Sequence, residues 1–223
     1  DARTRGTHMH LMCEYYLNGA INSFDINEPY LQATFEQLKT FSRTHRHYIP
    51  YRTEWRVWSS IGLVGTIDAV YIHPRTAQEA KRAACRPVGW GRRPEKVLYA
   101  TIFDWKRSQR ITKFAFNKQR GKGVLSRMPN SNFYHYSVQL NMYRWILETS
   151  YQNVYWQGEC YDRIEIVGMF LIAMHDLKDN YAKFEVPRYP PRLLESMLES
   201  LAPRPPSLVP AEPGQGAVGS RPL

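Results

Sequence analysis

Two carboxylates and a lysine lie where apolar strands are expected to pass or end. Asp68 lies inside the apolar segment 65–70, and Asp104 ends the apolar segment 97–104, with Lys106 two residues later. Side chains two residues apart on a strand share a face, and an adjacent strand can bring Asp68 beside that face. A buried carboxylate is costly unless it is paired or binds a metal. The set suits a hard divalent cation, although a salt bridge between Asp104 and Lys106 is the simpler explanation of that pair taken alone.

Further candidate residues lie on two predicted helices. His10 closes the segment 5–10 at the opening of the first helix, where it is a candidate ligand for the same ion or a structural histidine. Gln139 and Tyr143 are four residues apart and therefore share one face of a later helix. Such a pair has no specific role in most helices, but after a basic segment it could contact a phosphate backbone or a base.

Positive charge is concentrated in two segments. The chain has 223 residues, a formal net charge of +10 and a pI near 9.6, which favours a polyanionic partner. Segment 105–127 has eight basic residues and no acidic one, and segment 73–96 has seven basic residues and two acidic ones. A solvated basic loop explains such segments as well as nucleic-acid binding does.

The composition excludes several classes of protein. No apolar run approaches the roughly 20 residues of a membrane span, and the hydrophobic content of 43% excludes a wholly disordered chain. Cys13, Cys85 and Cys160 are too few for a four-cysteine iron–sulfur cluster and unlike a disulfide scaffold, so we expect a reducing, intracellular compartment such as cytoplasm, nucleus or mitochondrion. The chain begins with Asp1 rather than Met, so we expect a fragment or a processed form.

Hydrophobic periodicity predicts the elements that must position these residues. In chain order they are helices over 3–18 and 28–45, strands over 54–60, 63–72 and 97–104, a helix over 130–149, a strand over 164–174, a short edge strand over 183–186 and a helix over 190–201. Segment 73–96 is expected to be a surface insertion, and 202–223, with six prolines and three glycines, a disordered tail. The order predicts an α/β protein with helices around a small mixed sheet.

Four of these motifs, taken in order, resemble those of the RecB-like branch of the PD-(D/E)XK nucleases. They are Gly6-Thr7-x-x-His10, Gly65-x-Ile67-Asp68, Asp104-x-Lys106 and Gln139-x-x-x-Tyr143. The resemblance covers roughly residues 3 to 175. It implies a restriction-endonuclease-like three-layer core, which we place in one domain over 1–201. Relatives in this branch include the nuclease domains of recombination helicase–nucleases and the mitochondrial genome maintenance exonuclease.

The resemblance also implies roles for individual residues. His10, Asp68 and Asp104, together with the backbone carbonyl of Trp105, would bind Mg²⁺ or Mn²⁺. Lys106 would orient or activate the attacking water and stabilise developing charge. Some relatives carry an iron–sulfur cluster, which the three cysteines of this chain cannot supply.

Other residues are expected to hold the site and the DNA. By resemblance, Gln139 and Tyr143 would help to do both, and Glu54 falls where many relatives carry an acid at the start of the first strand. The basic segment must pass beside the site, because it joins the strand carrying Asp104 to the helix carrying Gln139. Its residues expected on the DNA path are Lys113, Lys118, Arg120 and Lys122, with Phe114 and Phe116 either stacking on unpaired bases or belonging to the core.

The sequence thus predicts a metal-dependent DNA nuclease, and specifically an exonuclease. It would hydrolyse phosphodiester bonds with metal-activated water, on DNA that has a free end or is single-stranded. Two alternatives remain open. One is a catalytically silent nucleic-acid-binding module on the same fold, and the other is a structural α/β domain whose basic loops bind another acidic partner.

Overall fold

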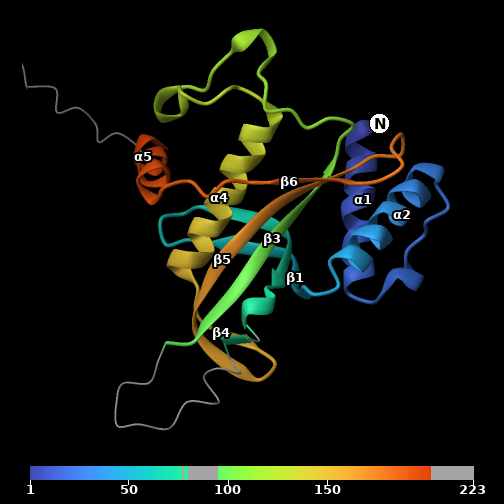
Figure 1. The fold of residues 1–223 in the computed structure, drawn as a ribbon, viewed down its shortest axis with the longest axis horizontal. Helices are drawn as coiled ribbons and strands as arrows, with labels where there is room; N and C mark the ends of the chain where they lie inside the picture. Colours follow the sequence, from blue (N-terminus) through green and yellow to red (C-terminus); the bar gives the residue numbers. More distant parts are fainter. Residues whose placement is uncertain (77, 80–94, 202–223) are drawn as a thin grey trace, which may run out of the picture.

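The protein is described here by a computed structural model that covers residues 1–76, 78–79 and 95–201 (Figure 1). Its elements are α1 (Ala2–Leu17), η1 (Ile21–Ser23), α2 (Pro29–Thr44), β1 (Ile49–Trp58), β2 (Val64–Ile72), β3 (Val97–Arg107), η2 (Phe116–Lys118), η3 (Gly123–Leu125), α4 (Asn132–Ser150), β4 (Gln152–Trp156), β5 (Glu159–Met174), β6 (Ala182–Glu185) and α5 (Pro191–Leu201). Most of the expected insertion over 73–96, and all of the tail over 202–223, lie outside the described residues. None of the helices in the described ranges has the length and apolar character that crossing a membrane requires.

The first two helices begin at residues suited to helix starts. The side chain of Asp1 accepts hydrogen bonds from the backbone N–H groups of Arg3 and Thr4, which otherwise lack partners in the first turn of α1. Pro29 stands in the first turn of α2, where its fixed φ suits a helix and its missing N–H costs nothing. Both helices therefore form where the sequence predicts them.

The strands form one mixed sheet in the order β1-β2-β3-β5-β4, and β6 pairs with β5 beside this path. Strands β3 and β5 are parallel, and the other paired strands are antiparallel. The hydroxyl of Tyr51 on β1 donates a hydrogen bond of 3.0 Å to the backbone carbonyl of Tyr155 on β4. This contact joins the two outer strands, so the sheet is nearly closed. The predicted α/β class, with a small mixed sheet flanked by helices, is confirmed.

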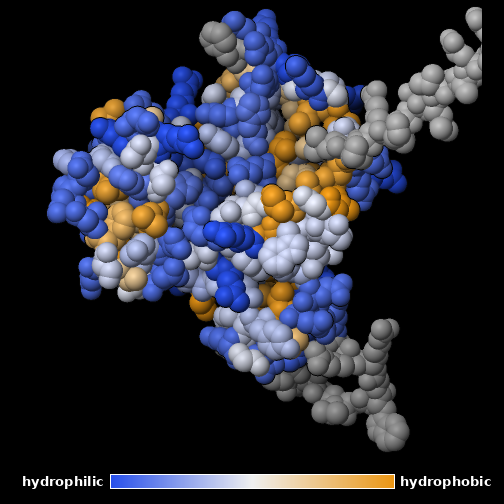
Figure 2. Space-filling view, turned by 180° about the vertical axis from the view of Figure 1, so that it is seen from behind, coloured by the Kyte–Doolittle hydropathy of each residue, from blue (hydrophilic) through white to orange (hydrophobic). Residues whose placement is uncertain are grey.

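Helices cover both faces of this sheet. Helix α4 packs on one face, where Leu140 and Ile146 meet sheet residues such as Ile102. Helices α1 and α2 pack on the other face, where Met9 and Phe41 meet apolar residues of β2, β3 and β5 (Figure 1). Seen from behind, the surface is largely hydrophilic, with hydrophobic side chains gathered right of centre (Figure 2). Two apolar cores thus hold the central strands from both sides.

Two strand predictions need correction. Strand β1 begins at Ile49 rather than Glu54, and it contains Pro50, which an edge strand tolerates because one side of its backbone is unpaired. Strand β4 was not predicted, because Gln152–Trp156 is short and lacks a clear alternation. It forms by pairing with the start of β5, which begins at Glu159 rather than Ile164.

The buried side of α4 also differs from the prediction. The sequence places Val138, Met142, Trp145 and Ile146 in the core. Of these only Ile146 is buried, and the buried stripe runs instead through Leu140, Tyr143 and Leu147. Helix α4 carries apolar residues on several sides, so the periodicity alone does not decide which side meets the sheet.

Candidate metal centre

The candidate site lies where β2 and β3 separate. Their pairing ends with Ala69 opposite Phe103, although β3 continues to Arg107. By the same register, Asp68 and Asp104 are the next residues on the two strands. Burial, and after it the charge of Asp68, raise the pKa of Asp104. The structure therefore brings together the two acids that the sequence singles out.

The carboxylate of Asp68 bonds to the backbone of β3 where β2 and β3 are no longer paired. Its Oδ2 atom accepts a hydrogen bond of 2.7 Å from the backbone N–H of Trp105. The N–H and carbonyl of one strand residue point to the same edge, so the Trp105 carbonyl also faces the gap beside Asp68. The indole of Trp105 is buried against α1 and α2 and anchors this part of β3. The Trp105 carbonyl and the Asp68 carboxylate, both of which are expected ligands, thus lie at the same edge of β3.

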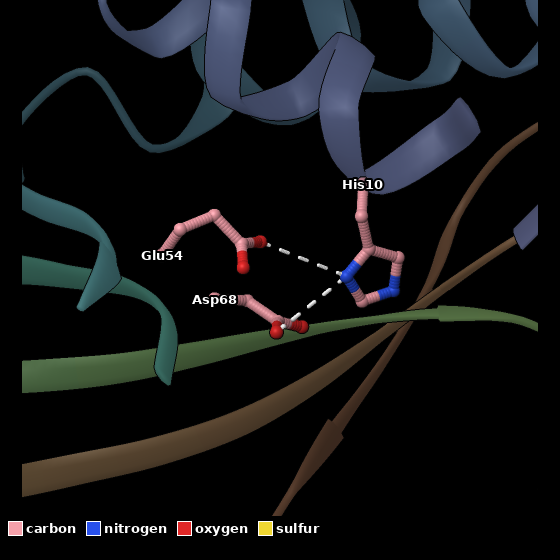
Figure 3. A group of neighbouring side chains, drawn as sticks. All are labelled: His10, Glu54 and Asp68. Atoms are coloured by element: carbon pink, nitrogen blue, oxygen red, sulfur yellow. Dashed lines mark ion pairs between the residues drawn. The ribbon is translucent and has the colours of Figure 1, made fainter. Parts of the chain in front are cut away.

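Three ligand-type side chains from three elements meet beside this gap (Figure 3). The Nδ1 atom of His10 on α1 lies 3.5 Å from Asp68 Oδ1 and 3.9 Å from Glu54 Oε1. The ligand atoms of all three residues lie within 4.8 Å of one another. Glu54 has a φ of 44°, in the left-handed region that non-glycine residues seldom adopt. Strain of this kind is concentrated at functional sites, where the surrounding structure holds a side chain in place.

The two acids keep a proton on His10. Burial lowers the pKa of the imidazole, but its interactions with Asp68 and Glu54 outweigh burial and raise the pKa to about 10. The protein without a cation therefore carries an imidazolium between two carboxylates. A divalent cation would take the place of that proton, because a histidine must be neutral to act as a ligand.

Asp104 and Lys106 form the second part of the site. Lys106 Nζ lies 2.7 Å from Asp104 Oδ2, and Asp104 is only 2% exposed. Burial, with the charge of Asp68, raises the pKa of Asp104 to about 7 against the opposing effect of Lys106. Burial lowers the pKa of Lys106, but Asp104 reverses the effect and the net pKa is raised, so the ammonium is retained. The simple salt bridge is present, but its carboxylate also interacts with the acid of the neighbouring strand.

Tyr136 belongs to the site although the sequence did not single it out. Lys106 Nζ lies 4.6 Å from the centre of the Tyr136 ring, so the ammonium is held between a carboxylate and an aromatic face. Tyr136 stands one helical turn before Gln139 on α4 and so lies on the same side of that helix. That spacing was the only available signal, and a tyrosine alone carries little information about its role.

Gln139 and Tyr143 brace the site from α4. The Gln139 side-chain amide donates a hydrogen bond of 2.8 Å to the Tyr143 hydroxyl, and Tyr143 is buried in the core. A Cβ atom on Gly65 would lie 2.4 Å from Tyr143 Cε1, so the glycine allows the ring to lie against β2. Through these contacts Gln139 and Tyr143 support β2 at Gly65, three residues before Asp68.

Most of the basic segment lies in solvent. Lys113, Lys118, Arg120 and Lys122 are exposed, and so is Phe114 at 83%. Lys113 Nζ lies 4.8 Å above the ring of Phe133, and Arg120 donates a hydrogen bond to the carbonyl of Arg127. The side chain of Phe116 lies outside the described part of the chain. A pocket of about 280 Å³ between this segment and α4 is lined by Arg120 and Lys122 but by none of the carboxylates of the candidate site.

The donor set matches the chemistry expected of a divalent cation. Carboxylate and carbonyl oxygens are hard ligands that suit Mg²⁺ and Mn²⁺, and the imidazole is a softer ligand beside them. His10, Glu54 and Asp68 come from α1, β1 and β2, so only the folded chain can assemble them. Asp104, a predicted ligand, is not among the side chains of this group and is paired with Lys106 instead. No protein-family model matches the chain, and no curated protein is similar enough to count as a relative.

Proposed function

We propose that the protein is a divalent-metal-dependent deoxyribonuclease, and specifically an exonuclease, built on a restriction-endonuclease-like core. The observation that carries this proposal is the arrangement at the parted ends of β2 and β3. There Asp68 accepts the Trp105 N–H while Asp104 is paired with Lys106, beside His10 and Glu54. A purely structural role leaves unexplained why three acids, a histidine and a lysine gather at one place.

His10, Asp68, Asp104 and the Trp105 carbonyl would hold Mg²⁺ or Mn²⁺, with Glu54 as a further candidate ligand. The ion, when bound, would lower the pKa of a bound water and neutralise charge on the phosphate. The protein's own side chains would then position the reacting groups and supply charge at the end of β3.

Lys106 supplies a positive charge beside the scissile phosphate. Its raised pKa keeps the ammonium protonated, so Lys106 acts as a hydrogen-bond donor that orients the attacking water and stabilises charge developing on the phosphate. Asp104 and the ring of Tyr136 fix the position of that ammonium. Gln139 and Tyr143 keep β2 and α4 at a constant separation.

The decisive experiment compares linear and circular DNA. End-labelled linear DNA and closed circles are incubated with the full chain in Mg²⁺, Mn²⁺ or EDTA, with the Asp104→Asn variant as a control. Degradation of linear DNA alone, only with metal and only by the unsubstituted protein, supports an exonuclease. Cleavage of circles shows an endonuclease instead. Binding of DNA without cleavage under every metal condition shows the catalytically silent module.

A further inference from the structure

The β1–β2 hairpin extends past the metal centre and leaves one face bare. Helices α1 and α2 pack on Ala69 and Tyr71, but among the described residues none from 55–67 belongs to that core. Val57 and Ile67 point to the opposite side and pack in the core that contains α4.

Residues on the bare face line up with the metal centre. Arg56 is paired with Thr66, and Trp58 belongs to the last pair before the turn. Glu54 lies two residues before Arg56 on β1, and Asp68 lies two residues after Thr66 on β2. Trp58 and Arg56 are two residues apart on β1 and share a face, and this row ends beside Glu54. The left-handed backbone of Glu54 departs from the strand alternation and lets its carboxylate lie beside His10. Trp58 and Glu54 are four residues apart, so their separation along the chain is at most about 14 Å, roughly the span of four stacked nucleotides.

The outer end of the row is an exposed aromatic residue. Trp58 is 63% exposed, and its neighbours Ile61 and Val64 are 59% and 78% exposed. The hydroxyl of Tyr151 accepts a hydrogen bond from the Trp58 backbone N–H, and the Tyr151 ring meets the indole edgewise with centroids 6.1 Å apart. The indole is therefore held in place while much of its surface stays in water. A held, exposed indole offers a base a stacking surface at little cost in side-chain entropy.

Arg56 gives the row a positive charge. Its side chain is exposed and makes no ion pair with any residue in the described ranges. An arginine between an aromatic surface and a cation site fits a polyanion whose bases are free to stack, since guanidinium binds phosphate and every unpaired base offers a flat face. A paired duplex does not offer those faces. An apolar peptide would use Trp58 but would have no use for Arg56 or the cation site.

We propose that this bare hairpin face, defined by Trp58, Arg56 and Thr66, binds the unpaired strand of the nucleic acid and leads it to the metal centre. A base stacks on Trp58, and the next phosphates contact Arg56 before the scissile phosphate reaches Asp68 and Glu54. This inference rests on the proposed nuclease function and adds to it the form of substrate and the direction of approach.

The test measures binding without cleavage. A labelled single-stranded oligonucleotide and a blunt duplex are titrated in EDTA with the full chain and followed by fluorescence anisotropy. Trp58→Ala should weaken binding of the single strand about 5- to 140-fold, the range for loss of one stacking aromatic, with a much smaller effect on the blunt duplex. Trp58→Phe should restore most of the affinity. Arg56→Gln should lower the salt slope of single-strand binding by about 0.7.

Matched controls separate this face from the rest of the surface. Tyr155 is 64% exposed on β4, and Arg46 is exposed after α2. Tyr155→Ala and Arg46→Gln should leave single-strand affinity and salt slope unchanged. Equal losses in these controls would mean that the hairpin has no special part and would overturn the inference.

Two further results distinguish the inference from the function on which it rests. If Trp58→Ala binds the single strand as the unsubstituted chain does, while metal-dependent cleavage persists, the hairpin proposal is wrong and the nuclease proposal stands. If the unsubstituted chain neither binds nor cleaves DNA, the nuclease proposal fails and the hairpin proposal fails with it. If Trp58→Ala loses single-strand affinity and Asp104→Asn loses only cleavage, both proposals are supported.

Discussion

The candidate metal centre and the exposed part of the basic segment both carry positive charge, but in opposite surroundings. At the candidate metal centre, Asp104 is 2% exposed and Lys106 lies between a carboxylate and an aromatic ring. In the basic segment, Lys118 and Lys122 lie in solvent. The energetic consequences differ, because a charge in low dielectric interacts strongly with a few fixed neighbours whereas an exposed charge is screened by water and salt.

This difference indicates how each region can contribute to function. Buried groups can perform chemistry, because their positions and pKa values are set by neighbours. Exposed lysines can attract and slide along a polyanion, because they act together and no one of them is essential. Substitutions at the centre should therefore have large individual effects, and substitutions in the basic segment should have small additive ones.

The largest expected effect is at β3. Asp104→Asn or Lys106→Ala should each lower the rate of DNA cleavage by at least about 10²–10³-fold, because each removes a group that acts on developing charge. Activity is measured on linear DNA with Mg²⁺, and folding is checked by circular dichroism. The matched controls are Asp179→Asn and Lys178→Ala, both on exposed residues after β5. Near-normal turnover in a folded Asp104 or Lys106 variant would remove the catalytic assignment.

The second expected effect concerns the histidine. His10→Ala should raise the metal concentration needed for half-maximal activity by about tenfold or more, since even the loss of an outer-sphere partner costs 10–100-fold in metal affinity. DNA affinity measured in EDTA should change much less. His8→Ala is the control, because His8 lies on the same helix and bonds to Tyr30 instead. An unchanged metal titration would make His10 a structural residue.

The third prediction uses the protons held at the centre. In the cation-free fold the pKa of Asp104 is raised from 3.8 to about 7, and the pKa of His10 is raised from 6.5 to about 10. At a pH between the ordinary and the raised value, each group therefore binds more protons in the fold than in the unfolded chain. Their contribution to the free energy of unfolding therefore falls as pH rises through these windows. Binding of a cation must release the protons, so apparent Mn²⁺ affinity should rise up to about tenfold per pH unit for each proton released.

Isothermal titration with Mn²⁺ at pH 6, 7 and 8 checks this third prediction. The slope of the affinity against pH should decrease in His10→Gln, which keeps a polar side chain but holds no proton. A Mn²⁺ affinity that does not change with pH would contradict a centre built from these two groups.

The smallest expected effect lies in the basic segment. Changing Lys118, Arg120 and Lys122 together to Gln should reduce the slope of log K against log salt by about 2 for single-stranded DNA, because each neutralised phosphate accounts for roughly 0.7 of that slope. Cleavage at saturating DNA should stay close to normal, because none of the three touches the metal centre. The same measurement on Arg43, Arg46 and Arg192 changed to Gln is the control. An unchanged slope in the first triple variant would mean that this segment faces away from DNA.

Local patterns were enough to predict much of the scaffold. The first two helices and the strands carrying Asp68 and Asp104 were predicted at nearly their observed positions, because helix starts and apolar runs depend on neighbours in the chain. The spacing of Asp104 and Lys106 likewise put them on one side of a strand before any fold was known. Sequence order alone therefore indicated which groups belong to the candidate site.

Only the tertiary structure decided how those groups meet. Strand β4 exists because β5 offers it a partner, and the buried side of α4 is set by where Tyr143 fits over Gly65. The left-handed backbone of Glu54, which brings its carboxylate to His10, has no local signature. These features depend on contacts between residues far apart in the chain. Their energies come from burial and charge in the assembled fold, which no local window of sequence contains.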